Sequence, residues 1–276
     1  MSVRIALFQS TTGIEPAKNQ AALLRAIREA ADGGSAMLFT PEMSGLLDRD
    51  SARARARLRT EDEDEVLAAC RAAARERGIW LHLGSLAVLT EGGKLANRGF
   101  VIDSNGEIRA RYDKLHLFDV DLPTGESWRE SATYEAGSGV ELVEGTPVGA
   151  LGLTNCYDLR FPGLFARLAE AGADVISVPA AFTVPTGRAH WHVLLRARAI
   201  EAGLFVVAAA QAGRHEDGRE TFGHSLVVDP WGEVALDMNG DRGVAFADID
   251  LSRIAEVRSR LPAIAHRRPI PEAVVR

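Results

Sequence analysis

The chain has 276 residues, of which 46% are hydrophobic and 25% are charged, so it can fold around a large core. Its formal net charge of −6 excludes a general basic field for nucleic acid or an anionic membrane. No uncharged apolar run reaches the roughly 18 residues that cross a bilayer, and two cysteines are too few for a disulfide scaffold. We therefore expect a cytoplasmic protein with no nucleic-acid and no membrane partner.

Short β-rich runs alternate with helical segments along the chain. The first half predicts strand 3–9, helix 16–31, strand 36–40, helix 61–77, strand 79–89, and a hairpin of strands 97–103 and 107–112. The second half predicts strand 148–154, helix 162–171, strand 174–179, helix 187–202 capped by Thr186, strands 204–210, 223–229, 233–237 and 244–250, and helix 251–260.

This alternation predicts an α/β protein, and the later strands have no helices between them, so a sheet must be mixed. No long Ser/Gly/Pro-rich linker divides the chain. We expect a single domain over residues 1–261, followed by a tail over residues 262–276 that could lie at a subunit contact.

Cys156 follows an apolar strand and precedes a helix. A cysteine on such a turn would expose its sulfur at the end of the sheet, near backbone N–H groups that lower a thiol pKa and can stabilise an oxyanion. Against this, a lone cysteine is more often a small buried hydrophobe. Cys70 lies mid-helix on an alanine-rich face and is expected to belong to the core.

A cysteine nucleophile needs a base and a group that stabilises negative charge. None of the seven histidines stands out as that base, and no pair of them has metal-site spacing, so we expect no metal. Glu42 and Lys114 each follow a predicted strand, where α/β sheets gather ligands. Taken singly, each is more often a surface charge. Together with Cys156 they could converge on one pocket, where the glutamate would remove the thiol proton, the lysine would stabilise the oxyanion, and the thiolate would attack a carbonyl.

These segments, in this order, resemble the signature of the nitrilase superfamily, the carbon–nitrogen hydrolases. The motifs are residues 41–42 (PE), 112–119 (YDKLHLFD) and 155–162 (NCYDLRFP), with 189–191 (AHW), 195–201 (LRARAIE) and 223–232 (GHSLVVDPWG) downstream. The resemblance implies a four-layer α–β–β–α sandwich with two mixed β-sheets, a homodimer or higher homo-oligomer, and no metal or organic cofactor. The strand pattern permits this layering but does not establish it.

The resemblance also implies a role for each motif residue. Cys156 would be the nucleophile, Glu42 the general base and later the general acid, and Lys114 the stabiliser of the tetrahedral intermediate. The family has a second glutamate that holds the lysine and the substrate amine. Glu130 matches it best, although Glu126 is close enough to leave the choice open.

Further candidates lie near the cysteine. The backbone N–H of Tyr157 would be the other oxyanion donor, and Arg160 would hold the cysteine loop by hydrogen bonds or reach an acidic substrate. Arg160, Phe182 and Thr186 match residues that line the substrate pocket. Alternatively, Phe182 fills the core and Thr186 caps a helix. Val184-Pro185 departs from the relatives and is expected to stiffen this loop.

Residues 208–215 (AAAQAGRH) and 266–269 (HRRP) look like deaminated glutathione amidases. The expected reaction is therefore hydrolysis of a small 2-oxo acid amide through a cysteine thioester, releasing a carboxylate and ammonia or an amine. Omega-amidases acting on 2-oxoglutaramate share nearly the same motifs, and hydrolases of N-carbamoyl amino acids or aliphatic amides are a further alternative. A catalytically silent binding subunit is the alternative of another class, against which the combination of Glu42, Lys114 and Cys156 argues.

Overall fold

Two six-stranded β-sheets form the centre of the molecule in a computed structural model that describes residues 2–121 and 125–275. In spatial order the first sheet contains β16 (Gly243–Asp250), β1 (Ser2–Gln9), β2 (Met37–Phe39), β3 (Trp80–Leu89), β4 (Leu95–Ile102) and β5 (Ile108–Asp113). The second contains β15 (Val234–Asp237), β14 (Leu226–Val228), β11 (Phe205–Ala208), β10 (Val175–Ser177), β9 (Gly149–Leu153) and β8 (Leu142–Thr146).

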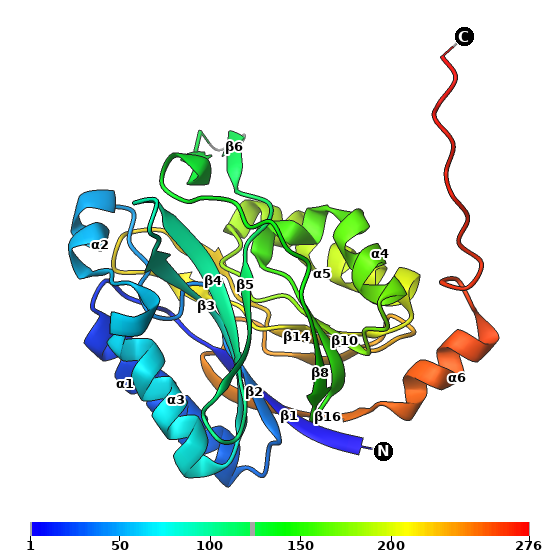
Figure 1. Cartoon of the computed structure of the whole chain (residues 1–276), viewed down its shortest axis with the longest axis horizontal. Coiled ribbons are helices and arrows are strands. Elements are labelled where there is room, and N and C mark those ends of the chain that lie inside the picture. The colour runs from blue at the N-terminus through cyan, green and yellow to red at the C-terminus, as the bar shows by residue number, and fades with distance from the viewer. Residues whose placement is uncertain (1, 122–124, 276) are drawn as a thin grey trace.

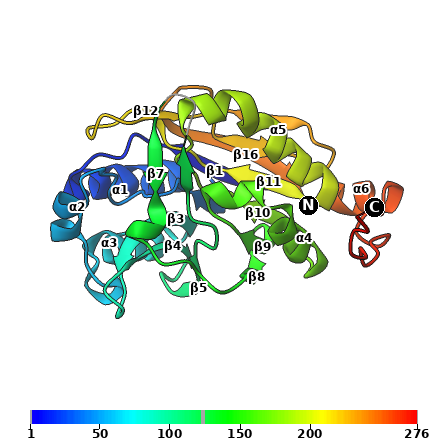
Figure 2. The same ribbon diagram turned by 90° about the horizontal axis from the view of Figure 1, so that it is seen from above.

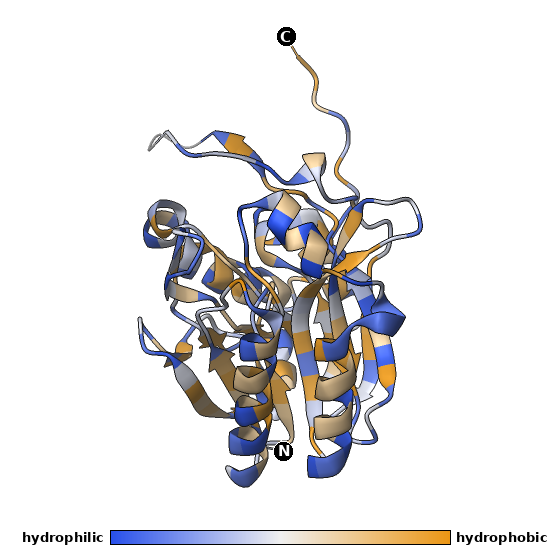
Figure 3. Cartoon of the chain, turned by 90° about the vertical axis from the view of Figure 1, so that its left-hand side faces the viewer, coloured by the Kyte–Doolittle hydropathy of each residue, from blue (hydrophilic) through white to orange (hydrophobic). Residues whose placement is uncertain are grey.

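Helices cover the outer faces of both sheets. The longer ones are α1 (Pro16–Asp32), α3 (Glu65–Arg77), α4 (Pro162–Glu170) and α5 (Val184–Ala202), with α2 (Ser51–Arg57) and α6 (Ser252–Arg260) at the periphery. Figures 1 and 2 show α1 and α3 on one side of the paired sheets and α4 and α5 on the other. In Figure 3 the helices carry both hydrophilic and hydrophobic residues, while the strands behind them are largely hydrophobic.

Three apolar clusters match these layers. One joins α1 and α3 to the first sheet, one joins α4 and α5 to the second, and the third lies between the sheets, where Leu7 and Phe39 face Leu153 and Val207. The predicted four-layer α–β–β–α sandwich is therefore confirmed. Both sheets are mixed, as predicted, because parallel strands in each are flanked by antiparallel ones.

Several predicted helix ends are confirmed by their local chemistry. Pro16 opens α1, where a missing N–H has no cost, and α3 ends at Gly78, which adopts φ 63°. The start of α3 is later than predicted. Residues 61–63 form a separate 3₁₀ turn, and the side chain of Asp64 then caps α3 by accepting a hydrogen bond from the N–H of Leu67.

The predicted start of α5 is wrong. The helix begins at Val184 with Thr183 at its N-cap, so Thr186 lies inside the first turn and its hydroxyl is 2.8 Å from that of Thr183. Pro185 occupies the first turn, where its fixed φ suits a helix and its missing N–H leaves no bond unmade. Val184-Pro185 therefore does not stiffen a loop, as expected from the sequence, but begins a helix.

Short elements escaped prediction. They are α2, β8, and two hairpins, one of β6 (Asp119–Asp121) with β7 (Ser127–Arg129) and one of β12 (Ala212–Arg214) with β13 (Glu220–Phe222). In the tail, Arg267 pairs with Glu170 of α4 at 3.1 Å, and the chain then runs away from the body of the molecule (Figure 1). Residue 276, its predicted end, lies outside the described residues. None of the helices within residues 2–121 and 125–275 is both long and apolar enough to span a bilayer.

Gly84 in β3 tests how tightly the site is packed. A Cβ added there would lie 2.6 Å from the Pro41 carbonyl oxygen and 2.6 Å from the Pro179 Cβ, both backbone-proximal atoms that cannot swing aside. We expect Gly84→Ala to lower the free energy of unfolding by about 1–3 kcal/mol. Gly163→Ala in α4 is the matched control, since nothing lies within 4 Å of the added Cβ. Urea denaturation should separate the two, and equal stability would contradict the close packing.

Candidate active site

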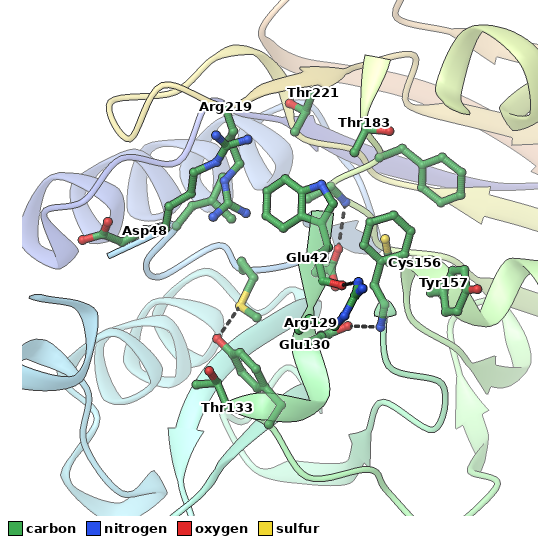
Figure 4. A pocket seen from close by; sticks show the side chains of 18 of the residues that line it. Glu42, Asp48, Arg129, Glu130, Thr133, Cys156, Tyr157, Thr183, Arg219 and Thr221 are labelled. Carbon is green, nitrogen blue, oxygen red and sulfur yellow. Dashed lines mark hydrogen bonds between the residues drawn. The ribbon is translucent and has the colours of Figure 1, made fainter. Parts of the chain in front are cut away.

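Four chain-distant residues line one cavity of about 470 Å³. Glu42 lies just beyond β2, Lys114 beyond β5 and Cys156 beyond β9, while Glu130 opens the 3₁₀ turn η2 (Glu130–Ala132) directly after β7. Figure 4 shows the side chains of Glu42, Glu130 and Cys156 gathered in this cavity. The convergence that the sequence predicted for three strand ends is thus present in the fold.

Lys114 is held between two carboxylates. Its side chain is only 2% exposed, and its Nζ lies 2.9 Å from Glu42 Oε1 and 2.9 and 3.1 Å from the two carboxylate oxygens of Glu130. An ammonium buried this deeply requires such partners, because an unpaired charge would be strongly destabilising there. The expectation that Lys114 taken alone is a surface charge is wrong.

Asn97 links the two carboxylates. Its amide nitrogen donates to Glu42 Oε1 at 2.9 Å and to Glu130 Oε1 at 3.1 Å, and its oxygen accepts from the Asn155 amide at 2.9 Å. Sequence analysis missed this residue, because its complete burial, which is what indicates a polar network, is a property of the tertiary structure. Asn97 therefore fixes the spacing of the two glutamates independently of the lysine.

Cys156 starts the 3₁₀ helix η3 (Cys156–Arg160) with φ 50°, a left-handed conformation that is uncommon outside glycine. Its N–H donates to the Pro179 carbonyl at 2.8 Å, and its sulfur lines the cavity together with the Glu42 carboxylate. The backbone N–H of Ala181 donates to Glu42 Oε2 at 2.9 Å and also reaches the sulfur. The residue is only 7% exposed, so the predicted exposed sulfur is wrong, but it still lines the cavity.

The electrostatics of the thiol also differ from expectation. Burial raises the pKa of Cys156 well above its ordinary value, and the Glu42 carboxylate raises it further, while Lys114 lowers it less. The prediction that turn N–H groups would leave a thiol of lowered pKa is therefore wrong. The resting site holds a protonated thiol in the same cavity as an ionised carboxylate.

In both charged partners the pKa shift favours the ionised form. Burial disfavours the ionised form of Glu42, but the Lys114 ammonium and hydrogen bonds from Cys156, Lys114 and Asn97 outweigh it, so the pKa of Glu42 lies below its usual value. Burial likewise disfavours charge on Lys114, yet Glu130 and Glu42 raise its pKa well above the ordinary value. Glu42 is thus an ionised proton acceptor in contact with an S–H donor.

Asp158, and not Arg160, holds the cysteine loop. The fully buried Asp158 carboxylate accepts from the Asn155 N–H at 2.8 Å, the Tyr112 hydroxyl at 2.7 Å and the His116 N–H at 3.0 Å. An aspartate three residues after an asparagine is the pattern of a capping box and could have been found in the sequence.

Arg160 lies behind the cavity wall. Its guanidinium is 3.2 Å from His190 Nδ1 and packs 5.8 Å from the ring centre of Phe182 and 6.0 Å from that of Tyr157. Phe182, Tyr157 and Thr186 themselves line the cavity, as predicted, and Phe182 also packs against Trp191 in the core. The core and pocket interpretations of Phe182 are both correct.

The structure separates the two candidate glutamates. Glu130 contacts Lys114 and also accepts from the N–H of Phe118 at 2.7 Å. Glu126 lies four residues earlier, at the cavity rim, where it is 3.5 Å from Arg49. Of these two candidates, Glu130 is the one that contacts Lys114.

Two other sets of ionisable residues lie outside the cavity. Cys70 is fully buried with a thiol pKa raised to about 12 by burial, and His82 is buried with a pKa lowered to about 3 by the same cause, so both belong to the core. Among the described residues, His192, His224 and Asp237 bring potential metal-ligand atoms within 4.8 Å of one another. Both imidazoles hydrogen-bond the Asp237 carboxylate, at 3.0 and 2.9 Å, outside the cavity.

Comparison with known proteins places this geometry in a family. Residues 4–259 match the carbon–nitrogen hydrolase family model. The deaminated glutathione amidase of Yersinia enterocolitica is 39% identical over 279 residues, which cover 100% of this chain and 96% of the relative.

Solved structures agree. The crystal structure of the Caenorhabditis elegans NitFhit protein matches with a TM-score of 0.90 and 39% identity, over 97% of this chain and 65% of that one. An amidase from a Nesterenkonia species, seen with acrylamide added at its active site cysteine, matches with a TM-score of 0.79 and 27% identity, over 94% of this chain and 98% of that one. The present chain belongs to the carbon–nitrogen hydrolase family and is an amidase of the nitrilase superfamily.

Proposed function

We propose that this amidase hydrolyses deaminated glutathione, with Cys156 as nucleophile. The observation that carries the mechanism is the convergence of Cys156 and Glu42 in one cavity, with Lys114 Nζ 2.9 Å from the Glu42 carboxylate. The observation that favours the substrate is the 39% identity over full length to a protein of that name. A cavity of about 470 Å³ is also within the usual range for a small organic ligand.

In the first half-reaction Glu42 takes the thiol proton as the sulfur attacks the amide carbonyl carbon. The negative charge that develops on the carbonyl oxygen is met by Lys114 and by the backbone N–H of Tyr157. Glu42 then passes its proton to the departing nitrogen, the C–N bond breaks, and the 2-oxoglutaryl group remains as a thioester on Cys156.

In the second half-reaction Glu42 removes a proton from a water molecule that attacks the thioester carbonyl. The tetrahedral intermediate uses the same two donors, and the thiolate leaves and recovers its proton from Glu42. Glu130 holds Lys114 by two hydrogen bonds, and Asn97 donates to both Glu42 and Glu130, so the two residues keep the lysine and the base in place without taking part in proton transfer. This chemistry assigns no step to a metal or an organic cofactor.

We also propose that the protein works in the cytoplasm. Both cysteines are free thiols, and the mechanism requires Cys156 to stay reduced, which a reducing compartment ensures. The substrate itself is tested by comparing deaminated glutathione, 2-oxoglutaramate, N-carbamoyl amino acids and simple aliphatic amides for amine or ammonia release. A preference for either of the last two classes would contradict the proposal.

Replacing the nucleophile separates the two cysteines. We expect Cys156→Ala to lose at least about 10³-fold in turnover while keeping its fold, because the mutation removes the attacking atom but little packing beside a cavity. Cys70→Ala, which truncates a fully buried side chain outside the lining of the active-site cavity, should lower the stability of the fold but keep turnover. Mass spectrometry of quenched reactions should find the acyl adduct on the wild-type enzyme and on Cys70→Ala, but not on Cys156→Ala. Full activity in Cys156→Ala would exclude the covalent route.

The two glutamates form a second matched pair. We expect Glu130→Gln to reduce kcat by about 10²–10³-fold, because it weakens the placement of the lysine that serves the oxyanion. Glu126→Gln should change kcat little, since within the described part of the chain its carboxylate pairs with the exposed Arg49 and does not reach Lys114. Steady-state kinetics with near-ultraviolet circular dichroism as the folding control tests this, and the reverse ranking would assign the role to Glu126.

Titration of the thiol tests the electrostatics. Glu42 raises the pKa of Cys156, so Glu42→Gln should form the thiolate at lower pH than wild type, although turnover is lost with the base. Lys114→Met should shift the thiol pKa the other way, because the ammonium lowers it. Thiolate absorbance as a function of pH measures both, with each protein also carrying Cys70→Ala so that Cys156 is the one cysteine that titrates. An unchanged or raised thiol pKa in Glu42→Gln would contradict the site as described.

A further inference from the structure

The cavity has a second end that the proposed chemistry does not use. Arg49, Trp128 and Arg219 line it, contributed by the segment before α2, by β7 and by the segment before β13. Figure 4 shows Arg219 well separated from Cys156, on the other side of Glu42. A substrate whose carbonyl lies at the sulfur can therefore extend toward these residues.

The two guanidinium groups pack on one indole. The guanidinium carbon of Arg49 lies 4.8 Å, and that of Arg219 lies 5.0 Å, from the ring centre of Trp128. Such cation–π contacts fix the planes of both guanidiniums and lower the entropic cost of using them to bind a ligand. The three side chains, which we call the rim cluster, thus form a preorganised unit.

The rim cluster retains unused donors. Asp217 binds Arg219 through its Nε at 2.7 Å and its backbone N–H at 3.0 Å, which orients the side chain and leaves its terminal nitrogens unbonded within the described part of the chain. Arg49 has one long contact, at 3.5 Å, to Glu126. Trp128 Nε1 is buried with no hydrogen-bond partner among the described residues, and a buried donor in that state calls for an acceptor.

Other acidic groups nearby do not fill this role. Asp48 and Glu220 also line the cavity. Arg53 engages both carboxylate oxygens of Asp48, at 2.7 and 2.8 Å, and no hydrogen bond or ion pair within residues 2–121 and 125–275 joins the Glu220 side chain to Arg49 or Arg219. A small anionic ligand is therefore the missing complement. Guanidinium groups match the planar, bidentate geometry of a carboxylate.

We infer that the rim cluster binds the terminal carboxylate of the amine half of the substrate. This inference rests on the proposed function. Deaminated glutathione loses a cysteinylglycine, which ends in a carboxylate, whereas 2-oxoglutaramate loses only ammonia and has nothing that reaches the rim. The rim cluster would then make the enzyme prefer amides whose leaving amine is a small peptide acid over primary amides.

Three substrates test the inference: deaminated glutathione, the same molecule with its glycine carboxylate converted to an amide, and 2-oxoglutaramate. We expect Arg219→Gln and Arg49→Gln each to reduce kcat/KM on deaminated glutathione by roughly tenfold, mainly through KM, because a charge-assisted hydrogen bond is lost. Neither variant should change kcat/KM on the amidated substrate or on 2-oxoglutaramate by more than about twofold.

Two controls separate charge and folding from contact. Arg55→Gln removes the same charge from α2, outside the cavity lining, and should leave all three substrates unaffected. Arg219→Lys keeps the charge but not the bidentate fork, so it should fall between wild type and Arg219→Gln.

The outcomes are distinct. Equal losses on all three substrates, or no loss on deaminated glutathione, would overturn the carboxylate subsite while leaving the amidase proposal standing. Wild-type enzyme that hydrolyses neither deaminated glutathione nor its amidated form would overturn the proposed substrate, and the subsite with it. Only the pattern in which the arginine variants lose activity selectively on the free carboxylate supports the inference.

Discussion

The rest of the site depends on one buried ammonium between two carboxylates. Taking Lys114, Glu42 and Glu130 out of water is costly, and the cost is offset only while all three keep their partners. The cluster carries one more negative than positive charge, and the surplus is met by uncharged donors, notably the Asn97 amide and the Ala181 N–H. Because these groups come from both sheets, the ion cluster can form only when the sandwich is assembled, so folding and reactivity are linked.

The same cluster decides where the proton rests before reaction. The Lys114 ammonium lowers the pKa of Glu42, and burial raises the pKa of the Cys156 thiol, so the two pKa values are far apart. A pair of titratable groups separated in this way can take distinct acid and base roles. Backbone N–H groups at the turn contribute, but a full negative charge in contact with the sulfur outweighs them. A protonated thiol beside an ionised base is also less open to adventitious oxidation than a free thiolate.

Sequence reasoning recovered what depends on periodicity and on motifs. Most helix ends follow from local patterns, such as Pro16 and Gly78 at the limits of their helices, whereas the four-layer sandwich was implied by the family resemblance. The pKa of Cys156 could not be inferred, because burial and the distance to Glu42 belong to the tertiary structure. The choice between Glu126 and Glu130 likewise depends on how the β6–β7 hairpin turns, and strands of three residues have too little periodicity to show in a sequence.

Several of the elements that escaped prediction, namely α2, β7 and β13, contribute residues to the cavity lining. Trp128 lies on β7 and Arg219 directly precedes β13, and both of these strands belong to two-stranded hairpins outside the main sheets. The reacting groups instead come after strands of the two main sheets, which the sandwich core holds rigidly. Loops on a rigid scaffold can vary without disturbing the fold, so selection among amides is best made there. An architecture of this kind can keep its bond-breaking chemistry while its substrate range changes through a few residues at the rim.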